Sequence, residues 1–387
     1  MTSHVNTNKA AVLHGPKDLR IETRSLPTTP PAGHVHVTVL ATGLCGSDLH
    51  YYLHGRNGDF ALRHPMALGH ESAGIISAVG PECPAQLSVG KRVAIEAGLY
   101  CRECERCQEG RYNLCPSMRF ASSAKTYPHL DGTLQSTLTW PAWGVHLLPT
   151  SVSYEVGALI EPLSVVLQGI RRCALANGER VLVTGAGAVG LLACAAAKGA
   201  GASYVVAVDI DEGRLDFAKR NSWADQTYTL AKSAPPVQGE EPAVTMGKAQ
   251  RVAKEMGEAL SLDSSAGAFD VVFECSGVPS CVQLAIFSTR PGGRVVLIGM
   301  GSPIQTLPIG AAALREVDIL GVFRYANTYP LAMEMLQRGE LKGIEKVISH
   351  RYTLEEAGEA FETLARGRGR DGRGVTKVFV VAEEGEE

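Results

Sequence analysis

Four cysteines lie close together in the chain, at Cys101, Cys104, Cys107 and Cys115. Four thiolates at this spacing can surround one tetrahedral ion, and a closed set of four sulfur ligands is typical of structural zinc. We expect this lobe to fold only with its metal. Paired disulfides and a cluster of reduced free thiols are the alternatives. The ten cysteines are too few for a disulfide-dense scaffold, and residues 1–9 lack the apolar core of a secretory signal, so we expect thiols that stay reduced and available to metal.

A second group of metal-binding side chains is dispersed along the chain. Cys45 lies in Gly-Leu-Cys-Gly-Ser-Asp-Leu-His, His70 and Glu71 are adjacent, and Glu161 lies in Ile-Glu-Pro-Leu-Ser. Each of them alone is common as a buried thiol, a surface imidazole or a solvated carboxylate. A catalytic zinc takes about three protein ligands and keeps one position open for a reactant. Together with a nucleotide motif later in the chain, these residues are candidates for such a centre.

The nucleotide motif consists of Gly185, Gly187 and Gly190, between an apolar run and an alanine-rich stretch. The first glycine permits a tight turn, the second lets the backbone approach a pyrophosphate, and the third lets the helix pack on the strand. Asp209 ends the next apolar run, where a carboxylate can accept hydrogen bonds from both ribose hydroxyls and repel the 2′-phosphate of NADP. NAD is therefore the expected cofactor, although Arg214 could accommodate that phosphate. A glycine turn that binds nothing is the alternative.

The elements around this motif alternate between strands and helices. The strand candidates are residues 181–184, 204–208, 271–274, 294–298 and 318–323, with helices at 191–198 and 214–220. This alternation predicts βαβ units, and hence an α/β fold with a Rossmann-type doubly wound parallel sheet. The first 160 residues are instead rich in Gly, Pro and His with short apolar runs, which predicts an irregular, mostly β domain.

Two regions are harder to assign from the pattern. Residues 230–268 interrupt the alternation with a loop at 233–239 and apolar side chains at helical spacing from Ala249 to Leu260, which we interpret as a surface insertion before the next helix. The tail after residue 324 contains two helical stretches and a final apolar strand. Spacing alone leaves open whether the tail extends the parallel sheet or returns to the first domain.

Composition narrows the classes of partner. The 387 residues are 45% apolar and 20% charged, which is ordinary for a globular chain of two or three domains. The formal net charge of −3 argues against a nucleic acid partner. The apolar run 181–208 is interrupted by five glycines and fits strand, turn, helix and strand better than a membrane span. We expect a cytoplasmic protein with a small-molecule partner, and neither nucleic acid nor membrane binding.

Five segments carry a family resemblance, at residues 43–51, 68–74, 110–116, 158–164 and 315–325. On these segments the sequence resembles the zinc-dependent medium-chain alcohol dehydrogenase superfamily. The Glu-Pro-Leu-Ser and Phe-Arg-Tyr pieces resemble its polyol branch, the sorbitol, xylitol and arabinitol dehydrogenases. The resemblance implies a discontinuous GroES-like catalytic domain of residues 1–162 and 324–387, a NAD-binding Rossmann domain of residues 163–323, and often a homotetramer.

The resemblance also implies roles for individual residues. Cys45, His70 and Glu71 would hold the catalytic zinc, with Glu161 reaching the metal directly or through water, while the four-cysteine zinc makes two ions per subunit. Substrate contacts are implied for Tyr51, Phe120, Glu161, Arg324 and Tyr325. Cofactor contacts are implied for Gly185, Gly187, Val189, Gly190, Asp209, Arg214, Ile298, Gly299, Met300, Val322, Phe323 and Arg324.

Some positions depart from the family pattern. Some polyol dehydrogenases lack the four-cysteine zinc, whereas this chain has all four cysteines. Lys91 stands where the family usually has Asp, and we have no interpretation of it. The loop 121–131 differs from the common shorter form and borders the expected pocket, which leaves the preferred polyol open.

The expected reaction is oxidation of a secondary alcohol to a ketose. Zinc would bind the hydroxyl and stabilise the alkoxide, which releases hydride to the nicotinamide. Ser47 and His50 resemble the family's proton relay, although Ser47 as a turn cap and His50 as a surface residue are the alternatives. Because Arg324 would suit a carboxylate, an acidic substrate stays possible. Other readings are a zinc dehydrogenase acting on threonine, a simple alcohol or an aldehyde, and a non-catalytic NAD-binding redox sensor.

Overall fold

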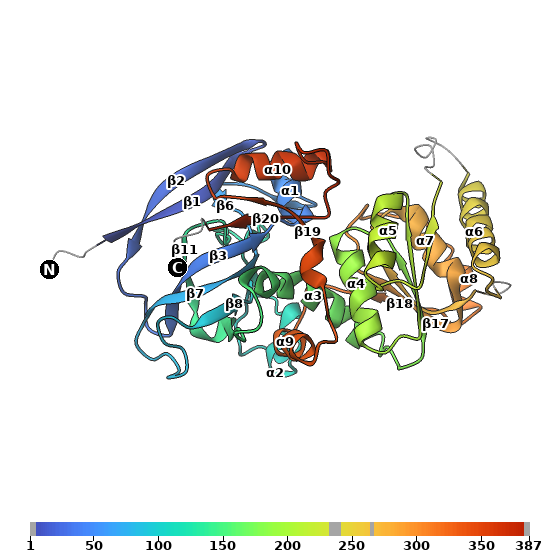
Figure 1. Cartoon of the computed structure of the whole chain (residues 1–387), viewed down its shortest axis with the longest axis horizontal. Helices are drawn as coiled ribbons and strands as arrows, with labels where there is room; N and C mark the ends of the chain where they lie inside the picture. The colour runs from blue at the N-terminus through green and yellow to red at the C-terminus, as the bar shows by residue number, and fades with distance from the viewer. Residues whose placement is uncertain (1–4, 232–240, 264–266, 383–387) are drawn as a thin grey trace. The chain divides into compact units, whose positions relative to one another are not determined.

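The computed structural model describes residues 5–231, 241–263 and 267–382, which form two compact units (Figure 1). The first unit comprises Met1–Pro162, Tyr329–Gln337 and Glu345–Glu387, and the second comprises Leu163–Thr328 and Arg338–Ile344. The domain division predicted from the sequence resumes the first domain at residue 324, whereas the compact first unit resumes at Tyr329.

A six-stranded parallel sheet forms the centre of the second unit, in the order β15-β14-β13-β16-β17-β18. Its strands are β13 (Arg180–Thr184), β14 (Tyr204–Asp209), β15 (Gln226–Thr229), β16 (Phe269–Glu274), β17 (Thr289–Leu297) and β18 (Asp318–Gly321). The chain winds outward from β13 to β15 and then returns to β16 on the other side of β13. Ligands of such sheets bind at the carboxyl ends of the strands at this switch point. The predicted doubly wound parallel sheet is confirmed.

The inner strands read as continuous apolar runs because helices cover both faces of the sheet. Val181, Val206 and Val272 on three neighbouring strands are fully buried. The helices of this unit are α4 (Ala188–Gly199), α5 (Glu212–Arg220), α6 (Pro242–Ala259), α7 (Pro279–Ser288) and α8 (Ile309–Ala313). Helix α3 (Tyr154–Arg172) contributes its second half to this unit.

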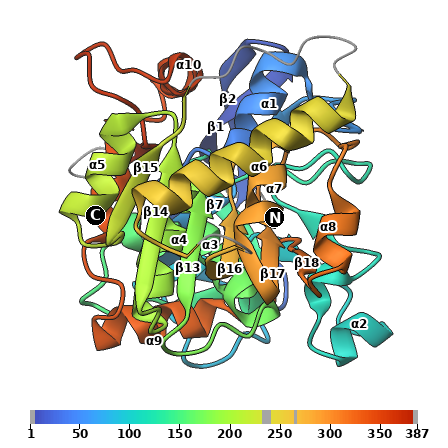
Figure 2. The ribbon, with the colours of Figure 1, turned by 90° about the vertical axis from the view of Figure 1, so that its right-hand side faces the viewer.

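Helix α6 corrects the interpretation of residues 230–268 as an insertion. Figure 2 shows α6 crossing in front of α7, against which it packs. Ala253, Met256 and Leu260 enter the same core cluster as Val272 and Ile286. The helix is therefore the regular crossover between β15 and β16, and its narrow apolar stripe is the reason that its sequence pattern looked like that of a surface element. The loop predicted at 233–239 lies outside the described residues.

The first unit is built around a seven-stranded, mostly antiparallel sheet in the order β12-β8-β7-β3-β20-β19, with β11 also paired to β3. These strands are β3 (His34–Gly43), β7 (Glu71–Val79), β8 (Arg92–Ile95), β11 (Thr137–Pro141), β12 (Val145–Leu147), β19 (Ile348–Tyr352) and β20 (Lys377–Val381). Strand β20 pairs antiparallel with β3, so that Phe379 lies opposite Gly43. The tail therefore returns to the first unit, a point that the sequence pattern left open.

Smaller elements complete the first unit. Helix α10 (Ala357–Arg366) packs on α1 (Gly46–His54), and Tyr52 stacks on Phe361 with ring centroids 4.9 Å apart. The remaining strands are β1 (Val5–Gly15), β2 (Asp18–Pro27), β4 (Arg56–Asn57), β5 (Phe60–Ala61), β6 (Met66–Ala67), β9 (Gly98–Leu99) and β10 (Arg119–Phe120). The remaining helices are α2 (Glu105–Gln108), α9 (Tyr329–Arg338) and the 3-10 turns Tyr112–Leu114, Ala142–Gly144 and Ile344–Val347.

No helix in the described parts of the chain combines the length and the apolar character that crossing a bilayer requires. The strand, turn, helix and strand predicted within residues 181–208 are confirmed, since these residues form β13, the glycine turn, α4 and most of β14. The predicted fold class is confirmed in both parts.

Candidate functional site

Three of the predicted metal ligands come together where β3 ends and β7 begins. The ligand atoms of Cys45, His70 and Glu71 all lie within 4.8 Å of one another. Cys45 is the N-cap of α1, directly after β3, and the pairing of β3 with β7 sets Gly43 opposite Glu71. A side chain at Gly43 would overlap the carboxylate of Glu71, so only glycine leaves room for it. Strand pairing thus brings together residues that are distant in sequence.

Asp48 supports this cluster from the first turn of α1. Its side chain is fully buried, with Oδ1 3.3 Å from His70 Nδ1. The hydroxyl of Ser122 donates to Oδ1 at 2.5 Å, and the backbone N–H of Cys45 donates to Oδ2 at 3.3 Å. Burial alone raises the pKa of Asp48, but His70 and these two donors outweigh it and lower that pKa.

The imidazole of His70 responds in the opposite direction. Burial alone would lower the pKa of His70, but Asp48 and then Cys45 raise it well above the ordinary value. The contact of Nδ1 with Asp48 is an ion-pair approach rather than an aligned hydrogen bond, since Nδ1 has no partner with hydrogen-bond geometry. The carboxylate of Asp48 therefore favours positive charge at this ring, either a proton or a bound metal ion. It also orients the ring, as carboxylates that contact metal-binding histidines do.

Lys377 is a charged residue of this cluster that the sequence reasoning missed. Its side chain is 5% exposed, and Nζ donates to the Leu44 carbonyl at 2.9 Å and to Glu71 Oε1 at 2.7 Å. Burial alone would lower the pKa of Lys377, but Glu71, Cys45 and, more weakly, Glu161 raise it. A lysine at the start of the final apolar strand was the available signal, because a buried ammonium requires a buried anion.

The donor set fits a zinc ion. Sulfur, imidazole nitrogen and carboxylate oxygen are the ligands that zinc takes, at roughly 2.0–2.3 Å each, and the three donor atoms already lie within 4.8 Å of one another. Glu161 on α3 is 5% exposed and lies outside the set of mutually close donor atoms. Its effect on Lys377 nonetheless shows that its charge is nearby.

The four-cysteine lobe forms a second donor set. Cys101 and Cys115 have sulfurs 3.5 Å apart, as do Cys104 and Cys107, and Cys101 lies 3.8 Å from Cys107. These distances exclude disulfides, whose sulfurs are about 2.05 Å apart, and all ten cysteines are free.

The thiols of this lobe differ in acidity. The backbone N–H groups of Glu103 and Cys104 lower the pKa of the Cys101 thiol to about 6, because they stabilise its thiolate. Burial and then a contact with Cys104 raise the pKa of Cys107 to about 12. A tetrahedral ion that all four sulfurs bind would remove this inequality, since the coordinated form is the thiolate at each position.

The glycine turn lies between β13 and α4 in the second unit. Gly185 has φ +90°, and a side chain at Gly190 would overlap the carbonyl oxygen of Gly185. Gly187 is the N-cap of α4, where backbone N–H groups are free to face a phosphate. Val189 is half-buried in the first turn of that helix.

Asp209 ends β14 beside this turn. Its Oδ2 accepts the backbone N–H of Ala186 at 2.6 Å, and its Oδ1 accepts that of Asp211 at 2.9 Å. The carboxylate is therefore fixed next to the turn and keeps further lone pairs for a ligand hydroxyl. Arg214 is half-buried in the first turn of α5, where its backbone N–H donates to Asp211.

The other predicted cofactor residues follow the carboxyl ends of β17 and β18. The N–H groups of Ile298 and Gly299 both donate to the Glu274 carbonyl at 2.9 Å, and Met300 is exposed. Val322 donates its N–H to Leu297 at 3.1 Å. Phe323 lies under the guanidinium of Arg324, 4.8 Å from the ring centroid, and Arg324 has a φ of +52°.

The predicted substrate residues divide between the units. Phe120 lies beside the metal-binding cluster, its ring centroid 5.5 Å from that of His70, and Tyr51 is buried with its hydroxyl oxygen accepting the N–H of Ala124 at 2.9 Å. Arg324 and Tyr325 belong to the second unit.

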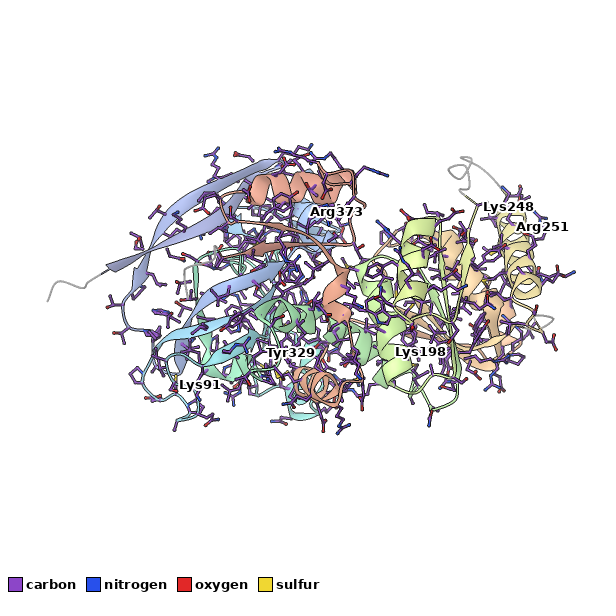
Figure 3. All side chains as sticks on the ribbon, viewed as in Figure 1. Lys91, Lys198, Lys248, Arg251, Tyr329 and Arg373 are labelled. Carbon is purple, nitrogen blue, oxygen red and sulfur yellow. The ribbon has the colours of Figure 1, made fainter. Side chains whose placement is uncertain are left out.

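The two predicted relay residues lie on α1. Ser47 is half-buried, and the capping interactions at the start of the helix come from Cys45 and Asp48, so Ser47 is not the turn cap. His50 is exposed, with its ring 6.1 Å from that of His54. Lys91 is an exposed residue of the first unit (Figure 3).

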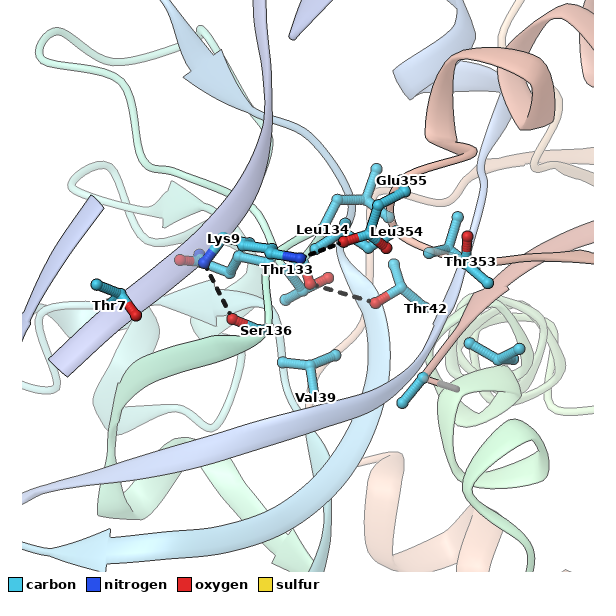
Figure 4. A pocket seen from close by; sticks show the side chains of 14 residues that line it. Thr7, Lys9, Val39, Thr42, Thr133, Leu134, Ser136, Thr353, Leu354 and Glu355 are labelled. Carbon is cyan, nitrogen blue, oxygen red and sulfur yellow. Dashed lines mark hydrogen bonds and ion pairs between the residues drawn. The ribbon is translucent and has the colours of Figure 1, made fainter. Parts of the chain in front are cut away.

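A cavity of about 470 Å³ in the first unit contains none of the predicted site residues. Figure 4 shows the ammonium of Lys9 paired with Glu355, an ion pair of 2.7 Å, and the backbone N–H of Lys9 bonded to the Ser136 hydroxyl. The hydroxyl of Thr42 donates to the Thr133 carbonyl in the same cavity. A smaller cavity of about 370 Å³ in the second unit lies beside Trp223 and likewise contains none of them. Neither is the candidate site.

Comparison with known proteins agrees with this chemistry. Residues 31–150 match the alcohol dehydrogenase GroES-like domain family, and residues 188–338 match the zinc-binding dehydrogenase family. The sorbitol dehydrogenase of Rattus norvegicus is 42% identical over 94% of each chain, and that of Arabidopsis thaliana is 41% identical over 93% of each. The solved structure of L-idonate 5-dehydrogenase from Escherichia coli superposes with a TM-score of 0.82 at 27% identity, covering 98% of this chain and 100% of that one. The chain therefore belongs to the zinc-dependent medium-chain alcohol dehydrogenases, in their polyol dehydrogenase branch.

Proposed function

We propose that this protein oxidises a secondary hydroxyl of a sugar alcohol, of the sorbitol, xylitol or L-arabinitol type, to a ketone and transfers the hydride to NAD. The observation that carries the proposal is the convergence of Cys45, His70 and Glu71 beside a buried carboxylate and a buried ammonium. The similarity of the chain to a sorbitol dehydrogenase supports polyol oxidation as the reaction at this site.

The metal-binding residues and the residues that support them would have different roles at the reacting hydroxyl. A bound zinc ion supplies Lewis-acid polarisation of that hydroxyl. Cys45, His70 and Glu71 would hold the ion, Asp48 keeps the His70 ring oriented, and Lys377 keeps the Glu71 carboxylate in place. Glu161 would contact the metal through water or a substrate hydroxyl, since it lies outside the close donor set. The four-cysteine lobe would hold a second, structural zinc.

Binding of the substrate and release of its proton involve further residues. Tyr51 and Phe120, with Arg324 and Tyr325, would contact the polyol chain. Ser47 and His50 would pass the hydroxyl proton to solvent. An exposed histidine suits that step, because an imidazole nitrogen can accept a proton and pass it to water.

The second unit would bind the cofactor. The glycine turn and the N-terminus of α4 offer N–H groups to the pyrophosphate, and Asp209 would accept the ribose hydroxyls. The remaining contacts would come from the predicted residues at the carboxyl ends of β17 and β18. The preference for NAD over NADP rests on the fixed carboxylate of Asp209.

Assembly, domain roles and location are part of the proposal. Residues 1–162 and 324–387 would form the catalytic domain and residues 163–323 the NAD-binding domain, in a cytoplasmic homotetramer. Exposed apolar side chains near β18, at Ile304, Ile309 and Leu314, support association of subunits.

The deciding experiment measures NADH formation by the zinc-loaded protein with xylitol, sorbitol, arabinitol, threonine and ethanol. We expect the polyols to give the highest kcat/KM. His70→Ala should abolish polyol-dependent NADH formation while NADH still binds, and His36→Ala, at a buried histidine bonded to Pro27, serves as the matched control. Highest activity on threonine or ethanol, or near wild-type turnover in His70→Ala, would refute the proposal.

A further inference from the structure

The loop of residues 121–131 begins beside the metal-binding cluster. It follows Phe120, whose ring lies against that of His70. Ser122 donates its hydroxyl to Asp48 at 2.5 Å, and Ala124 donates its N–H to the Tyr51 hydroxyl at 2.9 Å. The first half of the loop is thus bonded to the carboxylate behind a metal ligand and to a proposed substrate residue. Its shape therefore bears on what binds there.

The second half of the loop is held by two histidines. The N–H of His129 donates to His64 Nε2 at 2.9 Å, and the N–H of Arg63 donates to His129 Nε2 at 2.9 Å. The two imidazoles stack with centroids 4.2 Å apart and an interplanar angle of 27°. These reciprocal bonds join the loop to the segment before β6.

The hydrogen bonds define the protonation state of both rings. His64 Nδ1 lies 2.9 Å from the Pro65 carbonyl, and His129 Nδ1 lies 2.9 Å from the Thr126 carbonyl, so each Nδ1 carries the hydrogen. Each Nε2 accepts a backbone N–H and must therefore be unprotonated. Both rings are neutral in this arrangement.

Protonation of Nε2 on either ring replaces a hydrogen-bond acceptor with an N–H group. That N–H group then faces the backbone N–H that the nitrogen had accepted. The charged and titratable groups around the pair are Arg63, Tyr127, Asp131, which is paired with Arg24, and Arg119, which donates to the carbonyls of Pro128 and His129. Burial, the neighbouring His64 and Arg63 lower the pKa of His129, and together they outweigh the Thr126 carbonyl and Asp131.

A histidine whose pKa is lower in the folded protein contributes its full stabilisation above its ordinary pKa of about 6.5 and loses it as the pH falls. The paired histidines should therefore hold the loop at pH 7.5 and release it under mildly acidic conditions.

We propose that His64 and His129 are positioning residues, which hold the 121–131 loop in the shape that the polyol requires, and that protonation of the pair releases the loop and weakens substrate binding. The proposal rests on the proposed function and deepens it, because it assigns part of the substrate site to a loop that departs from the common family form.

The kinetic test compares KM at pH 7.5 and pH 5.5 for sorbitol and xylitol. For the wild type we expect KM to rise about fivefold at pH 5.5, because only the fraction with an ordered loop binds substrate. KM for NAD should not change in the same way, since the proposed cofactor residues belong to the second unit. His34→Gln, at a half-buried histidine of the same unit, is the matched control and should follow the wild type. Effects of pH on the reaction itself are common to all these proteins, so they cancel when the wild type is compared with a variant whose residues 64 and 129 cannot be protonated.

Two variants separate positioning from mere stability. His64→Phe keeps a stacking ring but removes the acceptor, so it should show the high KM at both pH values. The double variant His64→Gln with His129→Gln offers an amide oxygen at both positions and cannot be protonated, so its KM should be nearly independent of this pH change. An identical pH profile in the double variant and the wild type would overturn the proposal.

Hydrogen exchange decides the same question without activity. We expect amides of residues 121–131 to lose about tenfold in protection between pH 7.5 and pH 5.5, after correction for intrinsic exchange, while the strands of the same unit keep theirs. Unchanged protection of the loop would sink the proposal. If no polyol is oxidised at all, the proposed function fails, and this measurement still tests the histidine pair.

Discussion

At the scale of single residues, the candidate site consists of charges that hold one another in place. Asp48 orients His70, and Lys377 holds Glu71. Each of these supporting groups is nearly inaccessible to solvent. A buried charge is costly without a partner. Removing one member of such a buried pair should therefore lower the free energy of unfolding more than removing one member of a surface pair.

Lys377→Met tests this coupling. It leaves the buried Glu71 carboxylate without its cation, and breaking a buried pair typically costs about 3–5 kcal/mol. Urea denaturation should show a loss of this order in the free energy of unfolding. Lys9→Met breaks an exposed ion pair with Glu355 and should cost less than about 1 kcal/mol. Equal losses in the two variants would contradict the assignment.

Asp209→Ser tests the cofactor preference. Loss of the carboxylate removes both the ribose acceptor and the repulsion of a 2′-phosphate, so the ratio of kcat/KM for NADP to that for NAD should rise roughly tenfold or more. Asp211→Ser, at the exposed N-cap of α5, is the control and should leave this ratio near that of the wild type. An unchanged ratio in Asp209→Ser would remove this residue as the ribose ligand.

At the scale of elements, we expect the four-cysteine lobe to depend on metal, because it has little core of its own. Helix α2 has four residues and no buried side chain. The lobe is attached to the rest of the unit through Tyr112, whose hydroxyl donates to buried Glu96 at 2.7 Å. Short elements of this kind are ordered by the ion that they share.

Cys104→Ser should therefore lower the zinc content from two ions per subunit to one and expose residues 101–115 to proteolysis. Metal analysis by mass spectrometry together with limited trypsin digestion measures both effects. Cys83→Ser, at a half-buried cysteine outside the lobe, should keep both ions. One zinc per wild-type subunit, with no change in Cys104→Ser, would eliminate the structural site.

At the scale of the whole molecule, the proposed homotetramer would bury the exposed apolar residues that precede β18. Leu314 is 91% exposed and Ile304 is 87% exposed, which is unusual for large apolar side chains that stay in water. Leu314→Asp should shift the sedimentation coefficient toward smaller species. Val89→Asp, at another exposed apolar residue, should not change it. Identical sedimentation of Leu314→Asp and the wild type would exclude this surface.

The sequence predicted those features whose residues are close together in the chain. The glycine turn, the β13–α4 unit around it and the four-cysteine lobe are local, so spacing alone defines their geometry. The strands of the parallel sheet were also predictable, because strands that are buried on both faces have continuous apolar sequences. Helix α6 was misjudged as an insertion because a narrow apolar stripe does not distinguish a crossover helix from a surface helix.

Only the tertiary structure decided the features that depend on strand pairing. The placement of β20 beside β3 brings Lys377 to Glu71, and the pairing of β3 with β7 brings Cys45 to His70. The contact of His64 with His129 likewise joins two loops that are distant in the chain. Sequence by itself determined which chemical groups the protein has and its local turns. The partners of these groups depend on long-range packing. The sequence shows that a buried charge or a ring nitrogen needs a partner, but it does not show which residue supplies that partner.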